Sequence, residues 1–310
     1  MSTAWEGMLL VDKPAGPTSH DVVAAIRRAT GQSRAGHTGT LDPPATGLLV
    51  LLLGAATRLA AYVPAAPKVY AGTFRLGVTT LTDDLSEPVT AQHQGPLPPD
   101  GCVREEAARF VGSGRQIPPS ISARHVAGRR LYRAARKGVR IDAPDSAIHV
   151  ERFDVEPGED AGSWRFEASV STGTYIRAIV RDLGAALGCG AAVASLRRTR
   201  IGPLDVGSAA GTIRLEELEA AMVPLDAIPL DLPSTVLSAD HSRGFVHGRT
   251  ADTDRPDGPV AVRDAEGALL GIGEAAARRL APRVVLDRST PAALVAGRRA
   301  AVITSARSSS

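Results

Sequence analysis

Blocks of apolar residues, separated by glycine, proline and charged residues, predict both strands and helices in this chain. Residues 48–53 form a run of six apolar side chains, a length that favours a fully buried strand over a helix. Apolar and polar side chains alternate over 68–77 and 164–170, which is typical of strands with one buried face. Two more strands are expected over 8–11 and 148–155.

Helices are predicted where apolar residues recur every three or four positions. The first begins at Thr18 or Ser19, whose hydroxyl groups can cap it, and ends at Gly31. Short helices are also expected over 105–111 and 215–222.

A longer helix is predicted after the string 171–174, and it ends at Gly188. Its apolar stripe faces a core, and Arg177 and Arg181 are expected to lie off that stripe. A cation in the first turn of a helix opposes the helix dipole, so some partner should justify Arg177 there. An ordinary surface arginine is the alternative interpretation.

Composition limits the class of protein without naming a partner. A chain of 310 residues with 44% hydrophobic and 22% charged residues is typical of globular proteins with an ample core. The formal charge of +3 permits a nucleic-acid partner but does not require one. Cys102 and Cys189 have neither metal-site nor disulfide-framework spacing, which favours a reducing cytoplasm. We expect no signal peptide, no membrane span, no metal and no cofactor.

One segment is strongly basic. Residues 124–140 contain six arginines and Lys137 but no acidic residue. Arg129 and Arg133 begin a series at helical spacing on one side, which predicts a helix that faces RNA phosphates. A solvated helix face is the alternative, although such faces usually mix both charges.

The string 36–47 (Gly-His-Thr-Gly-Thr-Leu-Asp-Pro-Pro-Ala-Thr-Gly) leads directly into the apolar run 48–53. Its two prolines fix the backbone and its glycines permit sharp turns, so the segment is predicted to be a stiff irregular loop. A carboxylate such as Asp42 on a rigid loop, joined to a buried strand, is a typical way to hold a reactive group. An aspartate before proline is also a common start of a turn, which leaves a purely structural alternative.

This loop resembles the catalytic-loop motif of the TruB family of tRNA pseudouridine synthases, which carries the nucleophilic aspartate. The match keeps many residues in a fixed order, so it is far more specific than a short motif. Five further strings resemble the family: 12–19, 68–70, 80–84, 116–123 and 173–199.

The resemblance implies catalytic roles for three residues. Asp42 would attack the sugar or the base of the target uridine, or remove a ribose proton. Tyr70 would stack against the target uracil, and Arg177 would pair with the Asp42 carboxylate, for which the planar guanidinium fork is well suited. From the residues alone, a tyrosine packed in a sheet is the favoured interpretation of Tyr70.

Further residues are candidates for substrate binding by the same resemblance. His37 would assist base flipping, Leu196 would lie near the target base, and Lys13 could contact a phosphate. Tyr175, Arg129 and Arg133 complete the set of candidate binding residues. The alternatives are a loop histidine bonded to backbone, a buried strand leucine and a solvated surface lysine.

The resemblance also implies the architecture and the substrate. We expect an α+β fold: a catalytic domain over 1–230, built on a mixed, mainly antiparallel sheet flanked by helices, and a β-rich PUA-like RNA-binding domain over 231–302. Residues 303–310 are expected to be a disordered tail. The expected partner is the T-stem-loop of tRNA, with uridine 55 as the target, without a guide RNA, and with the protein as a monomer. A synthase for another RNA position and a non-catalytic tRNA-binding or folding factor remain alternatives.

Overall fold

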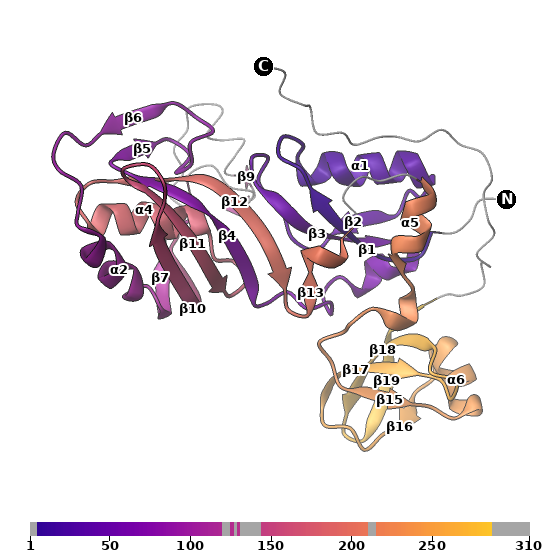
Figure 1. Cartoon of the computed structure of the whole chain (residues 1–310). Coiled ribbons are helices and arrows are strands. Elements are labelled where there is room, and N and C mark those ends of the chain that lie inside the picture. The colour runs from indigo at the N-terminus through magenta and orange to yellow at the C-terminus, as the bar shows by residue number, and fades with distance from the viewer. Residues whose placement is uncertain (1–4, 120–124, 127–128, 131–143, 210–214, 287–310) are drawn as a thin grey trace.

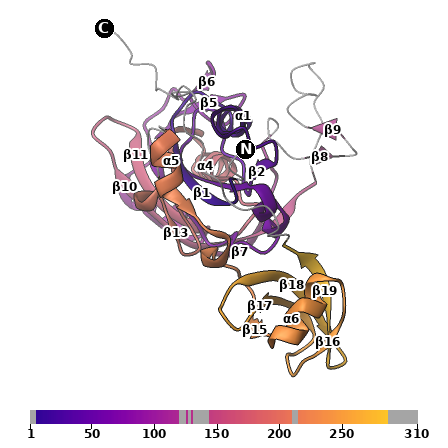
Figure 2. The ribbon, with the colours of Figure 1, turned by 90° about the vertical axis from the view of Figure 1, so that its right-hand side faces the viewer.

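The computed structural model of this chain describes residues 5–119, 125–126, 129–130, 144–209 and 215–286. Ten strands form one large sheet, and a second sheet of five strands follows in the C-terminal part of the chain. The smaller sheet lies below the larger one in Figure 1 and again in the turned view of Figure 2. In the described part of the chain, no helix is long and apolar enough to cross a membrane.

The large sheet has the strand order β14-β1-β3-β12-β4-β11-β10-β7, with β13 paired to β12 and β2 paired to β3. All these pairings are antiparallel except β12 with β3, so the expected mixed, mainly antiparallel sheet is confirmed. The strands are β1 (Gly7–Lys13), β2 (Ala35–His37), β3 (Thr46–Leu53), β4 (Lys68–Leu76), β7 (Gly112–Gln116), β10 (Ser146–Pro157), β11 (Ser163–Val170), β12 (Ala191–Ile201), β13 (Leu204–Asp205) and β14 (Met222–Val223).

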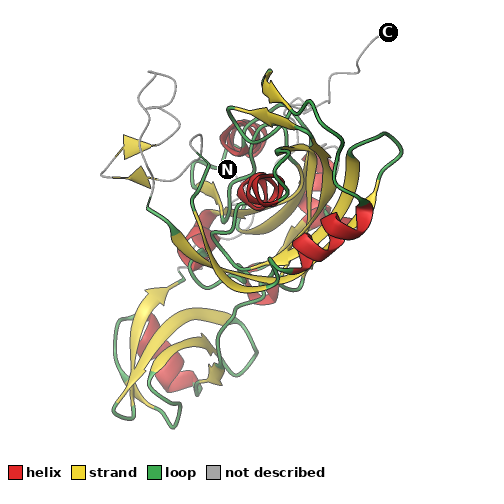
Figure 3. Ribbon diagram, turned by 90° about the vertical axis from the view of Figure 1, so that its left-hand side faces the viewer, coloured by secondary structure: helices red, strands yellow, loops and turns green. Residues whose placement is uncertain are grey.

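Helices cover the concave face of this sheet, as Figure 3 shows. The described helices are α1 (Ser19–Thr30), α2 (Asp100–Ala108), α4 (Ile176–Ala186), α5 (Leu215–Ala221) and α6 (Ala239–Val246), with short 3₁₀ turns η1 (Gly54–Leu59), η2 (Val206–Ser208) and η3 (Leu225–Ala227). Helix α1 has the predicted capping residue Thr18, in a capping box with Asp21, and it ends at Gly31 in a left-handed conformation. The short helix expected over 105–111 begins earlier, at Asp100, and ends at Ala108.

The apolar run 48–53 is buried on both faces of the sheet, which explains why it shows no alternation. Leu49 and Leu51 pack with α1 in one apolar cluster, whereas Leu48 and Val50 belong to a second cluster on the other face. That second cluster includes Leu269 of the five-stranded sheet, so apolar burial joins the two parts of the chain.

The five-stranded sheet has the order β15-β17-β18-β19-β16, and the expected β-rich C-terminal domain is confirmed. Its strands are β15 (Ser234–Val236), β16 (Ala251–Asp252), β17 (Gly258–Arg263), β18 (Leu269–Ala276) and β19 (Arg279–Val285). Two smaller sheets pair β5 (Val78–Thr80) with β6 (Val89–Gln92) and β8 (His125–Val126) with β9 (Arg129–Arg130).

The helix expected over 124–140 is wrong where the structure describes this segment. Arg129 and Arg130 pair as strand β9 with β8. The spacing that suggested a helix came from charged residues rather than from an apolar stripe, and only the latter fixes a helix against a core. Arg133 lies outside the described residues.

Candidate active site

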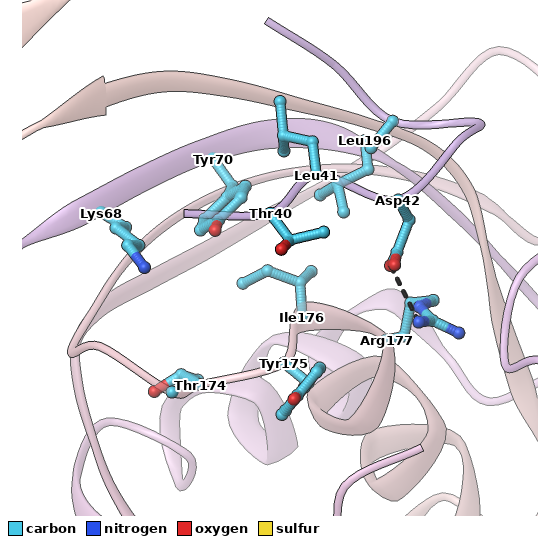
Figure 4. A pocket seen from close by; sticks show the side chains of 12 residues that line it. Thr40, Leu41, Asp42, Lys68, Tyr70, Thr174, Tyr175, Ile176, Arg177 and Leu196 are labelled. Carbon is cyan, nitrogen blue, oxygen red and sulfur yellow. Dashed lines mark ion pairs between the residues drawn. The ribbon is translucent and has the colours of Figure 1, made fainter. Parts of the chain in front are cut away.

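A cavity of about 290 Å³ lies where the loop after β2 meets β4, β12 and the start of α4. Figure 4 shows side chains from all four segments around it. The residues that line it are Thr40, Leu41, Asp42, Ala45, Lys68, Tyr70, Gly173, Thr174, Tyr175, Ile176, Arg177 and Leu196. Four further residues predicted from the sequence therefore meet Asp42 at one place: Tyr70, Tyr175, Arg177 and Leu196.

The loop that carries Asp42 is fastened on both sides of this residue. The backbone N–H of Leu41 donates to the Ser19 hydroxyl (2.8 Å), which in turn donates to the Leu41 carbonyl (3.0 Å). After the aspartate, the Ala45 N–H donates to the Asp42 carbonyl (3.1 Å). Leu41 is also 97% buried, so the loop is anchored by an apolar side chain as well. The carboxylate is thus held on backbone that cannot shift freely.

Lys13 is part of this anchor, and its expected contact with a phosphate is wrong. The side chain is fully buried, and Nζ donates to the carbonyls of Pro14 (2.9 Å), Pro17 (2.8 Å) and Pro43 (3.2 Å). The alternative of a solvated surface lysine is excluded by the same burial. The ammonium joins two proline-rich loops. A proline has a carbonyl acceptor but no N–H donor, so a side-chain donor such as Lys13 is suited to hold such loops together.

Arg198 holds the other end of the loop, a role that sequence reasoning missed. Its guanidinium donates to the carbonyls of Gly39 (3.0 Å), Thr40 (3.3 Å) and Leu48 (2.8 Å), and the side chain is 99% buried. The parallel pairing of β12 with β3 places Arg198 opposite Gly47. A Cβ at Gly47 would lie 2.2 Å from the Arg198 carbonyl oxygen, so only glycine permits this approach.

The predicted pairing of Arg177 with Asp42 is confirmed. Arg177 Nη2 lies 2.8 Å from Asp42 Oδ2, and Nη1 donates to the Thr82 carbonyl (2.6 Å). Figure 4 shows the pair at one side of the cavity. The alternative of an ordinary surface arginine is excluded, because the Arg177 side chain is only 5% exposed.

Asp84 is a second acidic partner of Arg177 that sequence reasoning did not identify. Its Oδ2 lies 3.6 Å from Arg177 Nη1, and its side chain is 10% exposed. Thr82 Oγ1 donates to Asp84 Oδ1 (3.0 Å), and the Ser86 N–H donates to the same oxygen (3.0 Å). The acidic, threonine-rich string 80–84 was the available signal, but a polar connection between strands was an equally good reading of it. The two carboxylates explain why a cation is stable in the first turn of α4.

Tyr70 and Leu196 line the cavity from adjacent strands. Tyr70 is 7% exposed on β4, and Leu196 on β12 lies opposite Gly72 of that strand. Tyr175 stands at the start of α4, where the Gln116 side chain accepts from its N–H (2.7 Å) and donates to its carbonyl (3.3 Å). Catalytic and binding roles for these residues stay predictions.

His37 does not line the cavity. It ends strand β2, and its ring meets His20 edge-on with 5.3 Å between ring centroids. Its Nδ1 is buried and has no hydrogen-bond partner among the described residues. Burial, and then the nearby charges of His20 and Arg198, lower the pKa of His37, which favours the neutral ring. At Nδ1, the alternative of a loop histidine bonded to backbone therefore does not apply.

The fold with this loop-borne aspartate is that of pseudouridine synthases. Two solved structures share it: "Crystal Structure of a Cbf5-Nop10-Gar1 Complex" (TM-score 0.66, 27% identity, 88% of this chain and 79% of that chain) and "Structure of H/ACA RNP bound to a substrate RNA containing 2'-deoxyuridine" (TM-score 0.69, 23% identity, 92% and 86%). The second likeness concerns the fold alone.

The chain belongs to the TruB family. Residues 27–176 match the model "TruB family pseudouridylate synthase (N terminal domain)", 177–237 match "tRNA pseudouridylate synthase B C-terminal domain", and 233–286 match "Pseudouridine synthase II TruB, C-terminal". The chain is 40% identical to "tRNA pseudouridine synthase B" of Thermobifida fusca, over 92% of this chain and 99% of that protein. The relative of the same name from Mycobacterium ulcerans is 39% identical over 92% and 96%. The predicted domain boundaries at 230 and 302 stay predictions.

Proposed function

We propose that this chain converts uridine to pseudouridine in tRNA, at uridine 55 of the T-loop, with Asp42 as the reacting carboxylate. The observation that carries the proposal is the Asp42–Arg177 ion pair beside a cavity large enough for about one nucleotide. The names of the two relatives support the choice of tRNA over other RNA.

The reaction is an isomerisation, so the product contains the same atoms as the substrate. The bond from C1′ of the ribose to N1 of uracil breaks, the base turns, and a bond from C1′ to C5 forms. The C5 proton leaves, and N1 gains a proton. Asp42 acts as nucleophile at the sugar or the base, or as the base that removes a ribose proton. Each route uses the carboxylate, which the buried guanidinium of Arg177 holds in place.

The remaining cavity residues hold the detached base. Tyr70 stacks on the uracil, and Leu196 covers it from the neighbouring strand. Because the cavity is about the size of one nucleotide, a nucleotide inside it excludes water from the cleaved bond. The uridine must leave its stack to reach Asp42, and His37, which does not line the cavity, assists that step.

The proposed partner is the tRNA T-stem-loop, bound by a monomer in the cytoplasm without a guide RNA. Phosphates contact the basic segment 124–140, including Arg129 and Arg133, and the C-terminal unit supplies further RNA contacts.

A non-catalytic tRNA-binding or folding factor is the main alternative from another class. Such a protein would have no use for Asp42, Tyr70 and Arg177 gathered around one cavity. The test is to incubate the protein with unmodified tRNA transcript and to map any isomerised uridine by carbodiimide labelling and primer extension. Conversion of the T-loop uridine alone supports the proposal. Conversion elsewhere corrects the target, and tight binding with no conversion favours the binding factor.

A further inference from the structure

We propose that Lys68 binds a phosphate of the everted target nucleotide, and this inference rests on the proposed function. The residue lines the same cavity as Asp42 but is not part of the ion pair. The proposed ligand is a phosphodiester of RNA, and the proposed site is the end of the cavity away from the reacting carboxylate.

The position of Lys68 is fixed by strand β4, of which it is the first residue, two positions before Tyr70. Figure 4 shows its ammonium directed into the cavity, at the opposite side from Asp42 and Arg177, with Tyr70 between them. A nucleotide whose base lies against Tyr70 would thus have its sugar–phosphate within reach of both ends of the cavity.

The ammonium is without a partner in the described part of the chain: no hydrogen bond and no ion pair joins it to those residues. The nearby cation Arg198 is, by contrast, fully engaged with backbone carbonyls. The Asp42 carboxylate is already paired with Arg177. A half-buried cation that has lost water without gaining an anion is costly, which is typical of a group that awaits a charged ligand.

The cations of Lys68 and Arg198 both lie close to Gly39. A Cβ built on Gly39 would lie 3.7 Å from Lys68 Nζ and 3.7 Å from Arg198 Nη1. Arg198 is buried and does not line the cavity, but its charge adds to the positive potential at this end, where an anion would meet Lys68 directly. The only anionic groups of RNA at neutral pH are its phosphates, since uracil and ribose offer neutral oxygens.

The same surroundings make the lysine titratable near physiological pH. Burial, and then repulsion from Arg198, lower the pKa of Lys68 to about 8. Phosphate binds the protonated form, so binding through Lys68 should be present below pH 8 and should be lost as the pH rises through 8.

The first test measures binding of a T-stem-loop RNA in the Asp42→Asn background, where no product forms. We expect Lys68→Met to weaken binding by about tenfold or more, and Lys68→Arg to retain most of it. Arg75→Met is the matched control, since it removes one positive charge from an exposed position near the other end of β4. We expect it to change the dissociation constant less than about twofold. Equal binding by Lys68→Met and Arg75→Met would overturn the proposal.

The second test measures how binding depends on pH and on single phosphate charges of the RNA. Binding by the protein with Lys68 should weaken between pH 7 and 9, whereas the Lys68→Arg protein should bind equally well over this range. A methylphosphonate placed 5′ or 3′ to the target uridine removes one phosphate charge. At one of these positions, the methylphosphonate should weaken RNA binding by the protein with Lys68. The same methylphosphonate should not weaken binding by the Lys68→Met protein any further. Additive losses at both positions would show that Lys68 binds no phosphate there.

These outcomes are separate from the proposed function. Pseudouridine formation by the unsubstituted protein tests the reaction, and the phosphate–lysine coupling tests Lys68. If the protein converts uridine but shows no coupling, only the inference about Lys68 fails.

Discussion

Arg177 Nη2 contacts Asp42 Oδ2 at 2.8 Å, although the two residues belong to a helix and a loop that are far apart in the sequence. The arginine side chain is 5% exposed and the aspartate side chain 33% exposed, so the buried cation holds a carboxylate that still opens to the cavity. This asymmetry suits a group that must react with an incoming nucleotide.

Asp42→Asn should abolish pseudouridine formation while leaving tRNA binding nearly unchanged. The amide keeps the shape of the side chain but cannot act as nucleophile or base. Single-turnover assays and filter binding with the same transcript measure the two properties. Residual turnover near that of the unsubstituted protein would show that another group performs the chemistry.

Arg177→Met should lower both stability and turnover. The substitution leaves Asp42 and Asp84 without their cation and the Thr82 carbonyl without its donor. Losing one partner of such a pair costs up to about 3 kcal/mol, with Asp42 contributing less because it is partly solvated. Denaturant unfolding measures the loss. Arg177→Lys should recover part of the stability but little turnover, because an ammonium cannot reproduce the fork. Full activity of either variant would contradict the assigned role.

Arg198→Met should loosen the loop before Asp42, whereas Arg197→Met should not. The first substitution removes three donors from buried carbonyls and should cost about 3 kcal/mol. Arg197 pairs with Asp12 at a partly exposed position, so its loss should cost less than about 1 kcal/mol. Hydrogen exchange of residues 39–46 should increase in Arg198→Met alone. Equal exchange in both variants would mean that the loop is held by its other contacts.

Neutralising arginines in the segment 124–140 should weaken tRNA binding in a salt-dependent way. Each lost phosphate contact should reduce the slope of log K against log salt concentration by about 0.7–0.9. Arg133→Ala with Arg136→Ala is the informative variant, and Arg75→Ala is a control of the same charge type. An unchanged slope would place this segment away from the RNA.

The secondary structure of this protein was largely predictable, because its signals are local. The caps Thr18 and Gly31 and the uniform run 48–53 each specify an element without help from the rest of the chain. The helix predicted over 124–140 is wrong where the structure describes this segment. Charge spacing indicates which residues can share a face, but it does not supply the apolar burial that fixes a helix.

The sequence by itself determined which elements form and, through a long ordered motif, that Asp42 and Arg177 belong to one site. Only the tertiary structure decided that Lys13 and Arg198 hold the loop instead of binding substrate or solvent, and that Lys68 faces the cavity without a partner among the described residues. The reason is physical. Burial and pairing of a charge depend on which distant strands become neighbours, and the parallel junction of β12 with β3 has no local signature in either strand.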